Sequence, residues 1–196
     1  CPPVTPLVSP QAFPLPSLPR RQPTVLVVCG PAQNGAIGLV CARHLRSFVP
    51  APPCRPPRVF WGEFFRPRDT WGHLGTPLSP PQVQLINDAY NAVVDAVLGA
   101  EVAEGPEPCA AILATLKHIR IPIVSLDVPS GWSAEAGGSG GISPEVLVSL
   151  AAPKECARRF GGRHHFVAGR FLPHEVQRKF GINVPPYPGT ECVVAL

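Results

Sequence analysis

Residues 24–48 read TVLVVCGPAQNGAIGLVCARHLRSF, and this stretch decides the fold class. Its first six residues form a continuous, mostly β-branched apolar run between a proline and a glycine. Such a run is typical of a parallel strand that is buried on both faces. Apolar residues then recur at three-residue steps, which predicts a helix over residues 38–48. The stretch therefore reads as a strand, a glycine-containing turn and a helix.

The same alternation continues along the chain. Short apolar runs predict further strands at residues 92–98, 121–126, 145–150 and 165–168. Helical spacing of apolar residues predicts helices at residues 82–90, 109–119, 153–160 and 173–180. Strands that alternate with helices imply a parallel sheet with right-handed crossover connections. We therefore predict the α/β class, with a Rossmann-like three-layer sandwich around a mainly parallel sheet.

Proline is concentrated in two blocks. Residues 1–23 contain 8 of the 28 prolines, and residues 49–81 contain 9. Because proline removes a backbone donor and fixes φ, the first block cannot sustain a helix or a central strand. We predict that it is a disordered leader in front of one domain at residues 24–196. The second block has no apolar period, so we expect it to add no regular parallel strand.

The composition excludes several classes of protein. Hydrophobic residues make up 45% of the 196 residues, yet no apolar run approaches the roughly 18 residues of a membrane span. The net charge of +4 equals the surplus of residues 151–196, which is too small and too poor in aromatic residues for a nucleic-acid partner. The seven cysteines contain no CxxC pair, which excludes a zinc ribbon and favours buried free thiols in a reducing compartment. The chain starts at Cys1 and contains no methionine, as expected of a fragment or a processed form.

Polar side chains follow the predicted strands at the edge where open α/β sheets bind ligands. Asn34 lies in the turn after the first strand, Asp95 lies within the second run, and Asp127 and Ser130 follow the third. A carboxylate inside an apolar strand must be paired, hydrogen-bonded or bound to a metal. Asp95 is therefore either a structural group that caps backbone amides or a functional one. The glycine turn has two interpretations as well: close packing of helix on strand, or backbone amides offered to a phosphate.

Two further patterns in the sequence give little indication of a functional site. Residues 137–141 match the GxSxG spacing of a nucleophile elbow, but no strand precedes them, so we interpret them as a loop. His164 and His165 adjoin a strand, so we expect their side chains on opposite faces of the sheet rather than together at a metal.

Four segments taken together resemble one family. They are PTVLVVCGPAQNGAIGLVCARHL, VVDAVLG, IPIVSLDVPSGW and the tail that runs from APKECARRFGGRHHFVAGRF to PPYPGTECV. In this order they are similar to the YjeF N-terminal domain family, over roughly residues 24–48 and 82–196. The family includes NAD(P)H-hydrate epimerase, also called apolipoprotein A-I-binding protein. The resemblance implies a Rossmann-like fold, interconversion of the R and S forms of hydrated NADH and NADPH, and a potassium ion near the substrate.

The resemblance also implies roles for individual residues. Asn34, Asp95 and Ser130 match the cation ligands, and their oxygen donors suit a hard cation. Asp127 matches the acid/base aspartate beside the nicotinamide. The substrate-binding positions are matched by Gln33, Asn34, Gly35, Gly99 and Asp127.

The chain departs from the family at the turn and after Gly99. The family's turn reads GPGNNGGDG and this one reads GPAQNGAIG, so Gln33, Ala36 and Ile37 replace an asparagine, a glycine and an aspartate. The segment after Gly99 reads AEVAEGPEP, whose glutamates repel a pyrophosphate. Residues 49–81 do not resemble the family, and its helices before the first strand are missing. We therefore expect the fold to be incomplete at its N-terminus and at 49–81.

These departures favour a catalytically impaired relative of NAD(P)H-hydrate epimerase that acts as a binding or regulatory protein. By family precedent, its partner is apolipoprotein A-I or high-density lipoprotein, in cholesterol efflux and angiogenesis. One alternative is an active epimerase in metabolite repair, because Asp127 and the cation residues persist. Another is a variant that does not fold. The sequence also leaves open whether the chain binds a ligand resembling hydrated NAD(P)H and whether it forms a homodimer. The compartment is open as well: cytoplasmic, mitochondrial or secreted.

Overall fold

The computed structural model describes residues 24–48, 58–61, 80–100, 109–135, 140–170 and 172–196, so the leader predicted at residues 1–23 lies outside the described residues. The described residues form a seven-stranded sheet in the order β2-β1-β3-β4-β5-β6-β7. All neighbouring strands are parallel except β7, which is antiparallel to β6. The strands are β1 (Val25–Cys29), β2 (Arg58–Trp61), β3 (Ala92–Ala96), β4 (Ile123–Leu126), β5 (Val146–Leu150), β6 (His164–Ala168) and β7 (Val193–Ala195).

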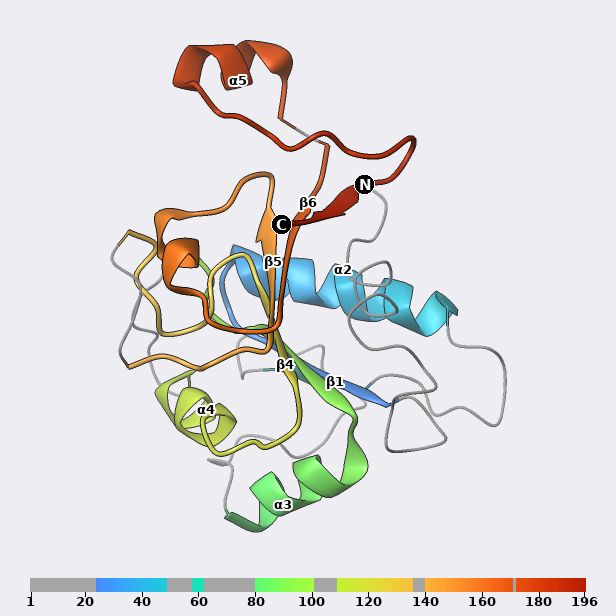
Figure 1. Cartoon of the computed structure of the whole chain (residues 1–196). Helices are drawn as coiled ribbons and strands as arrows, with labels where there is room; N and C mark the ends of the chain where they lie inside the picture. Colours follow the sequence, from blue (N-terminus) through green and yellow to red (C-terminus); the bar gives the residue numbers. More distant parts are fainter. Residues whose placement is uncertain (1–23, 49–57, 62–79, 101–108, 136–139, 171) are drawn as a thin grey trace.

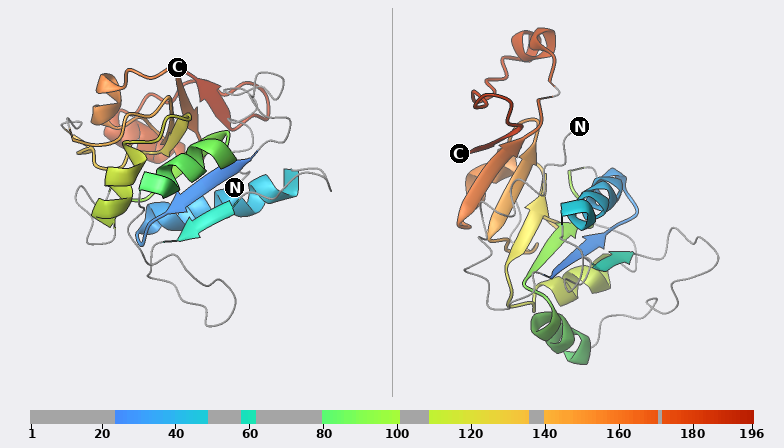
Figure 2. Two further views of the ribbon diagram at one scale, coloured as in Figure 1. Left: turned by 90° about the horizontal axis from the view of Figure 1, so that it is seen from below. Right: turned by 90° about the vertical axis from the view of Figure 1, so that its right-hand side faces the viewer.

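Helices cover both faces of this sheet (Figure 1 and Figure 2). α2 (Gln33–Phe48) packs on one face, and α3 (Pro80–Ala89) and α4 (Cys109–Leu116) pack on the other. The 3₁₀ helix η2 (Glu155–Arg159) follows β5, and α5 (His174–Phe180) projects from the body after β6 (Figure 1). This arrangement confirms the predicted α/β sandwich of three layers around a mainly parallel sheet. No described helix is long and apolar enough to cross a membrane.

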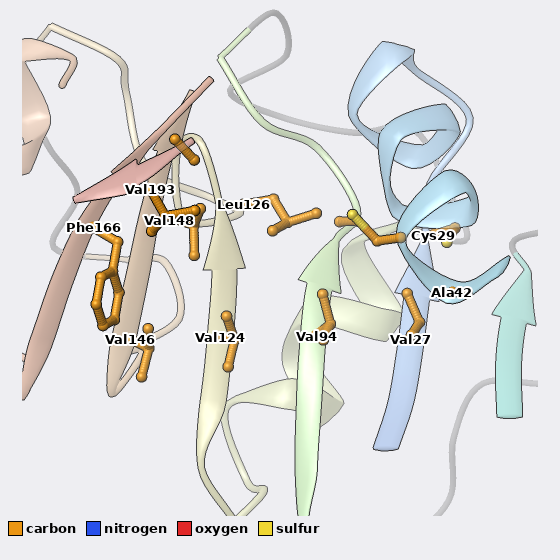
Figure 3. Close-up of a cluster of buried hydrophobic side chains, with 13 residues drawn as sticks. Val27, Cys29, Ala42, Val94, Val124, Leu126, Val146, Val148, Phe166 and Val193 are labelled. Carbon is orange, nitrogen blue, oxygen red and sulfur yellow. The ribbon is translucent and has the colours of Figure 1, made fainter. Parts of the chain in front are cut away.

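The hydrophobic core is divided between the two faces of the sheet. Val94 of β3 belongs to the cluster under α2, together with Val27, Val124 and Phe166 (Figure 3). Its neighbour Val93 belongs to the opposite cluster, with residues of α3 and α4. Because consecutive strand residues point to opposite faces, both faces of a covered sheet need apolar side chains. This is why the strands read as continuous apolar runs in the sequence.

Three glycines allow α2 to lie close to the sheet. A Cβ added to Gly35 would lie 1.9 Å from the carbonyl oxygen of Gly30, and a Cβ on Gly30 would lie 1.8 Å from that of Val97. A Cβ on Gly38 would lie 2.5 Å from the Cβ of Ala96. No side chain fits at these distances, so the structure confirms the packing role of the glycine turn. Phosphate binding by the same turn stays a prediction.

The prediction that residues 49–81 add no parallel strand was wrong. β2 lies within this block and pairs in parallel with β1, with Leu26 opposite Arg58 and Cys29 opposite Trp61. The prolines of the block flank these four residues and none interrupts them, so no ladder donor is lost inside the strand. β2 is also an edge strand, which forms hydrogen bonds on one side only and is the place where nearby prolines are tolerated.

Other element boundaries differ from the prediction. The helix predicted from residue 38 begins at Gln33, because the amides of Gly35 and Ala36 already bond to the carbonyl of Ala32. The helix predicted at residues 153–160 is the short 3₁₀ helix η2. β7 was not predicted, since three residues are too few to show a strand period.

The two adjacent histidines of β6 lie on opposite faces of the sheet, as predicted. The His164 ring stacks on Phe166, with ring centroids 6.0 Å apart. His165 Nε2 is 2.9 Å from the Oγ of Ser149 on β5, and its ring lies near Phe160. Both histidines therefore have packing or hydrogen-bonding partners within the fold.

Candidate functional site

The candidate site lies at the carboxyl ends of the central strands, where the strand order reverses. β1 is flanked by β2 on one side and by β3 on the other, so the carboxyl ends of β1 and β3 mark the topological switch point of the sheet. Ligands of open α/β sheets bind at such points. The start of α2 brings Asn34 and Gly35 to this edge, the turn after β3 brings Gly99, and the loop after β4 brings Asp127 and Ser130.

Asp95 is fully buried, and donors of this chain occupy its carboxylate. Oδ1 accepts hydrogen bonds from Ser130 Oγ at 2.6 Å and from Val97 N at 3.2 Å. Oδ2 accepts from Ser125 Oγ at 2.9 Å and from Ser130 N at 3.0 Å. An ionised carboxylate has about four acceptor positions, and these bonds fill them. The structure therefore shows the structural role that the sequence left open, the capping of backbone amides.

Burial raises the pKa of Asp95 above its usual 3.8, and the hydrogen bonds from Ser130, Ser125 and Val97 oppose that rise. Every other residue of β3 is apolar and buried. The carboxylate is tolerated there because all of its acceptor positions are hydrogen-bonded. It joins β3 to β4 through Ser125, and to the loop after β4 through Ser130.

Asn34 supplies the one buried side-chain acceptor that has no hydrogen-bond partner within the described ranges. The residue is 6% exposed, and its Nδ2 donates to the carbonyl of Leu126 at 3.4 Å, whereas Oδ1 is unpartnered. Gly99, at φ 75°, packs directly against it, since a Cβ there would lie 2.8 Å from the Asn34 Cβ. A buried acceptor without a partner costs about 1–3 kcal/mol unless a bound group satisfies it. Asn34 Oδ1 is therefore available to a ligand.

The oxygen atoms at this point suit an alkali cation in part. Ser130 Oγ donates to Asp95 and accepts from Leu98 N at 3.0 Å, which leaves it one lone pair. Asn34 Oδ1 offers a second oxygen, whereas the hydrogen bonds to Asp95 leave its carboxyl group no vacant acceptor position. Across the described segments no three His, Cys, Asp or Glu side chains form a group that could hold a metal ion. Asn34 and Ser130 therefore offer one oxygen each and Asp95 offers none, and a bound potassium ion stays a prediction.

Asp127 follows β4 with φ 65°, in the left-handed region that non-glycine residues rarely adopt and that often marks functional sites. Its Oδ1 accepts hydrogen bonds from Leu150 N at 3.1 Å and from Lys154 Nζ at 2.5 Å. Its Oδ2 has no hydrogen bond to the part of the chain that the structure describes. One oxygen of the predicted acid/base group is thus anchored to β5 and the following turn, and the other is available.

Lys154 is a site residue that sequence reasoning missed. It lies beyond β5 and forms an ion pair with Asp127, which follows β4. The sequence signals were the basic surplus of residues 151–196 and the resemblance of the tail that begins APKECARRF, and neither singles out this lysine. Its place at the site depends on the parallel pairing of β4 with β5, which brings the ends of the two strands side by side.

The remaining predicted positions lie at the start of α2 and after β3. Gln33 and Ala36 are exposed, whereas Ile37 is partly buried and packs against the core cluster under α2. Position 37 therefore gives the core an apolar contact and gives the site no polar group. Glu101 and Glu104, predicted to repel a pyrophosphate, lie outside the described residues.

Comparison with known proteins agrees with this architecture. The model of the YjeF-related protein N-terminus family matches residues 15–156, more than half of the chain. The chain is 56% identical over 194 residues to human YjeF N-terminal domain-containing protein 3, with 95% of this chain and 65% of that protein covered. It is 51% identical over 201 residues to YjeF N-terminal domain-containing 3 of Danio rerio, with 95% and 78% covered.

A solved structure supports the same conclusion. The crystal structure of yeast ynu0, YNL200c, superimposes with a TM-score of 0.74 at 28% sequence identity, covering 97% of this chain and 85% of that chain. The chain spans a little less than two thirds of the length of the human relative. The family match runs through residues 49–81, where β2 lies. The fold and these matches agree, and the chain belongs to the YjeF N-terminal domain family.

Proposed function

We propose that this chain binds a hydrated nicotinamide nucleotide, or a ligand of similar shape, and converts it slowly or not at all. Two acceptors support the binding part: Asn34 Oδ1, which has no partner among the described residues, and Asp127 Oδ2. Asn34 lies at the switch point, and Asp127 lies after β4 at the same edge of the sheet, where open α/β sheets bind ligands. The hydrated ring carries a hydroxyl group and a carboxamide, whose hydrogens are suitable donors for these oxygens.

The start of α2 supports binding of the nucleotide's phosphates. The first turn of α2 contains no acidic residue, so its free backbone amides and the helix dipole favour an anion. In the family's turn an aspartate stands where this chain has Ile37. Replacing that carboxylate by an apolar group removes a negative charge from α2, which favours an anion at the start of the helix, and also removes a group that could transfer a proton.

The packing of Ile37 is the observation that carries the second part of the proposal. Its side chain contributes to the cluster under α2, and a hydrocarbon group can neither accept a proton nor orient one. A positioned acid or base contributes typically 10²–10⁴-fold to a rate. Asp127 can still act as one acid or base, but the site lacks the carboxylate that the family has at the position of Ile37. We therefore expect binding to survive this replacement better than turnover.

An active epimerase is the second candidate, and the geometry of Asp127 favours it. Two donors fix Oδ1, and the left-handed backbone at this residue is the kind of strain that persists at functional sites. A potassium ion, where bound beside Asn34 and Ser130, would supply positive charge next to the ligand. This role predicts that affinity for the nucleotide falls when choline replaces potassium in the buffer.

Isothermal titration of the chain with hydrated NADPH tests the binding proposal. We expect saturable binding that is tighter than binding of NADPH itself, because NADPH lacks the added hydroxyl group. Asp127→Asn should weaken binding of the hydrated form, and Asp88→Asn, which changes an exposed carboxylate on α3, should not. Equal affinity for both nucleotides, or no binding to either, would overturn the proposal.

The regulatory role is proposed from family precedent: association with apolipoprotein A-I or high-density lipoprotein, linked to cholesterol efflux and angiogenesis. Purified apolipoprotein A-I immobilised on a sensor surface gives a direct test. Saturable binding of this chain is the expected result. A response no larger than that of albumin under the same conditions would remove this part of the proposal.

A further inference from the structure

Lys154 lies at the edge of the candidate site, outside the residues matched to the family's site. Its ammonium group contacts Asp127 Oδ1 at 2.5 Å and the carbonyl of Leu150 at 3.1 Å. The side chains of Lys154 and Asp127 are 32% and 14% exposed, so water reaches the pair but does not surround it. An ion pair in such a place is held more firmly than one on the open surface.

The three groups form a closed set of hydrogen bonds. Leu150 N donates to Asp127 Oδ1, Lys154 Nζ donates to the same oxygen, and Lys154 Nζ also donates to the carbonyl of Leu150. Leu150 is the last residue of β5, a rigid element of the sheet. The carboxylate of Asp127 is therefore tied to the end of β5 directly by Leu150 N and indirectly by Lys154, both through one oxygen.

The backbone around the pair is shaped to permit these bonds. Asp127 has φ 65° and Ala151 has φ 66°, and each directly follows a strand. The amide of Asp127 donates to the carbonyl of Val148 at 2.7 Å, and the amide of Ala151 donates to that of Ala168 at 2.9 Å. Left-handed conformations of non-glycine residues cost free energy and persist only where surrounding contacts determine them. Here they bring the two strand ends into the arrangement that pairs Lys154 with Asp127.

We propose that Lys154 is a positioning residue for Asp127. It fixes Oδ1 and leaves Oδ2 as the oxygen that meets the ligand. This inference rests on the proposed function, because it assumes that the nucleotide binds beside Asp127. A general acid or base must stand within hydrogen-bond reach of the group that it serves, and small misplacements are costly. Without the ammonium group, a single backbone amide would hold Oδ1, and the two oxygens would exchange places more readily.

Exchange of the Leu150 amide hydrogen with solvent tests the positioning without any ligand. Lys154→Met keeps the length of the side chain and removes its donors, so Leu150 should exchange about tenfold faster or more, as expected for a weakened charge-assisted hydrogen bond. Lys154→Arg should restore most of the protection. Lys117→Met, an exposed lysine after α4, is the matched control and should leave exchange unchanged. Unchanged protection in Lys154→Met would overturn the proposal.

A double-mutant cycle on the binding of hydrated NADPH gives the second readout. Lys154→Met should weaken binding about tenfold in the unaltered chain and have little further effect in Asp127→Asn, because it acts through that carboxylate. A merely structural role would show the same loss in both backgrounds, and that result would contradict the proposal. If the unaltered chain binds no nucleotide, the proposed function fails, and the exchange of Leu150 alone then decides whether Lys154 positions Asp127.

Discussion

Removing the carboxylate of Asp95 should destabilise the whole sheet. The group is fully buried and accepts four hydrogen bonds, two from backbone amides and two from hydroxyl groups. Asp95→Ala leaves the amides of Val97 and Ser130 without an acceptor, whereas the hydroxyls of Ser125 and Ser130 can rotate towards other partners. The backbone cannot rotate in this way, so the two amides determine the size of the effect.

The magnitude follows from these two amides. Each buried donor left without a partner costs about 1–3 kcal/mol, which gives roughly 2–6 kcal/mol for Asp95→Ala. A loss near 4 kcal/mol lowers the melting temperature of a chain of this size by roughly 8–16 °C. Asp95→Asn should cost about half as much. Each carboxylate oxygen accepts one amide and one hydroxyl, so either orientation of the new NH₂ group faces only one backbone amide.

Urea denaturation followed by circular dichroism measures both variants, with Asp88→Ala as the matched control. Asp88 is exposed on α3, and its replacement should change stability by less than about 0.5 kcal/mol. Because burial raises the pKa of Asp95 in the folded state, its contribution is complete below the unfolded value near 3.8 and declines as pH rises through the folded value. The stability difference between the wild type and Asp95→Asn should therefore shrink as pH rises.

Two results would refute this reasoning. If Asp95→Ala melts within about 2 °C of the wild type, the hydrogen bonds of Asp95 do not support the fold. If the difference between the wild type and Asp95→Asn grows with pH, the sign of the pKa shift is wrong and the carboxylate is stabilised rather than penalised by its surroundings.

The remaining predictions concern packing, protonation and thiol reactivity. Gly35→Ala should prevent stable folding, because the added Cβ would lie 1.9 Å from the carbonyl oxygen of Gly30. Gly161→Ala is the control and should be neutral, because a Cβ there meets nothing within 4 Å. Comparable melting curves for the two variants would contradict this prediction. Burial lowers the pKa of His165, so its contribution to stability is present above about 6.5 and is lost as pH falls through the folded value. His165→Asn should flatten this acid-side loss in urea titrations at pH 5 and 7.5, and an unchanged slope would count against it. Burial also raises the pKa of Cys29 to about 12, so its thiol stays protonated and unreactive at pH 8. Peptide mapping after alkylation at pH 8 should therefore find Cys192 labelled and the buried Cys29 unlabelled. Early labelling of Cys29 would contradict this prediction and show that β1 is accessible.

The central strands and the edge of the sheet that carries their polar residues followed closely from local sequence. Continuous apolar runs predicted the central strands, because a sheet covered on both faces needs apolar side chains at every position. The polar residues at the ends of these runs then had to lie along one edge, since parallel strands end together. Asp95 and Ser130 lie in direct contact for this reason.

What the sequence did not predict depends on contacts between distant segments. β2 was missed because the composition of a proline-rich block conceals four uninterrupted residues whose structure depends on pairing with β1. Lys154 was missed because a lysine among other basic residues has no local signature, and its role arises only where β4 and β5 end side by side. The saturation of Asp95 likewise needs the loop after β4, which residue types alone cannot place.

Turnover of hydrated NADPH is the most direct test of the central claim, a retained nucleotide site with little epimerase activity. The conversion of the S form to the R form, followed by chromatography, should not exceed the spontaneous rate in the unaltered chain. The combined variant Gln33→Asn, Ala36→Gly and Ile37→Asp should accelerate it by at least about tenfold, since it restores a carboxylate at the start of α2. Rapid conversion by the unaltered chain, unchanged in the combined variant, would contradict the account and establish an active epimerase.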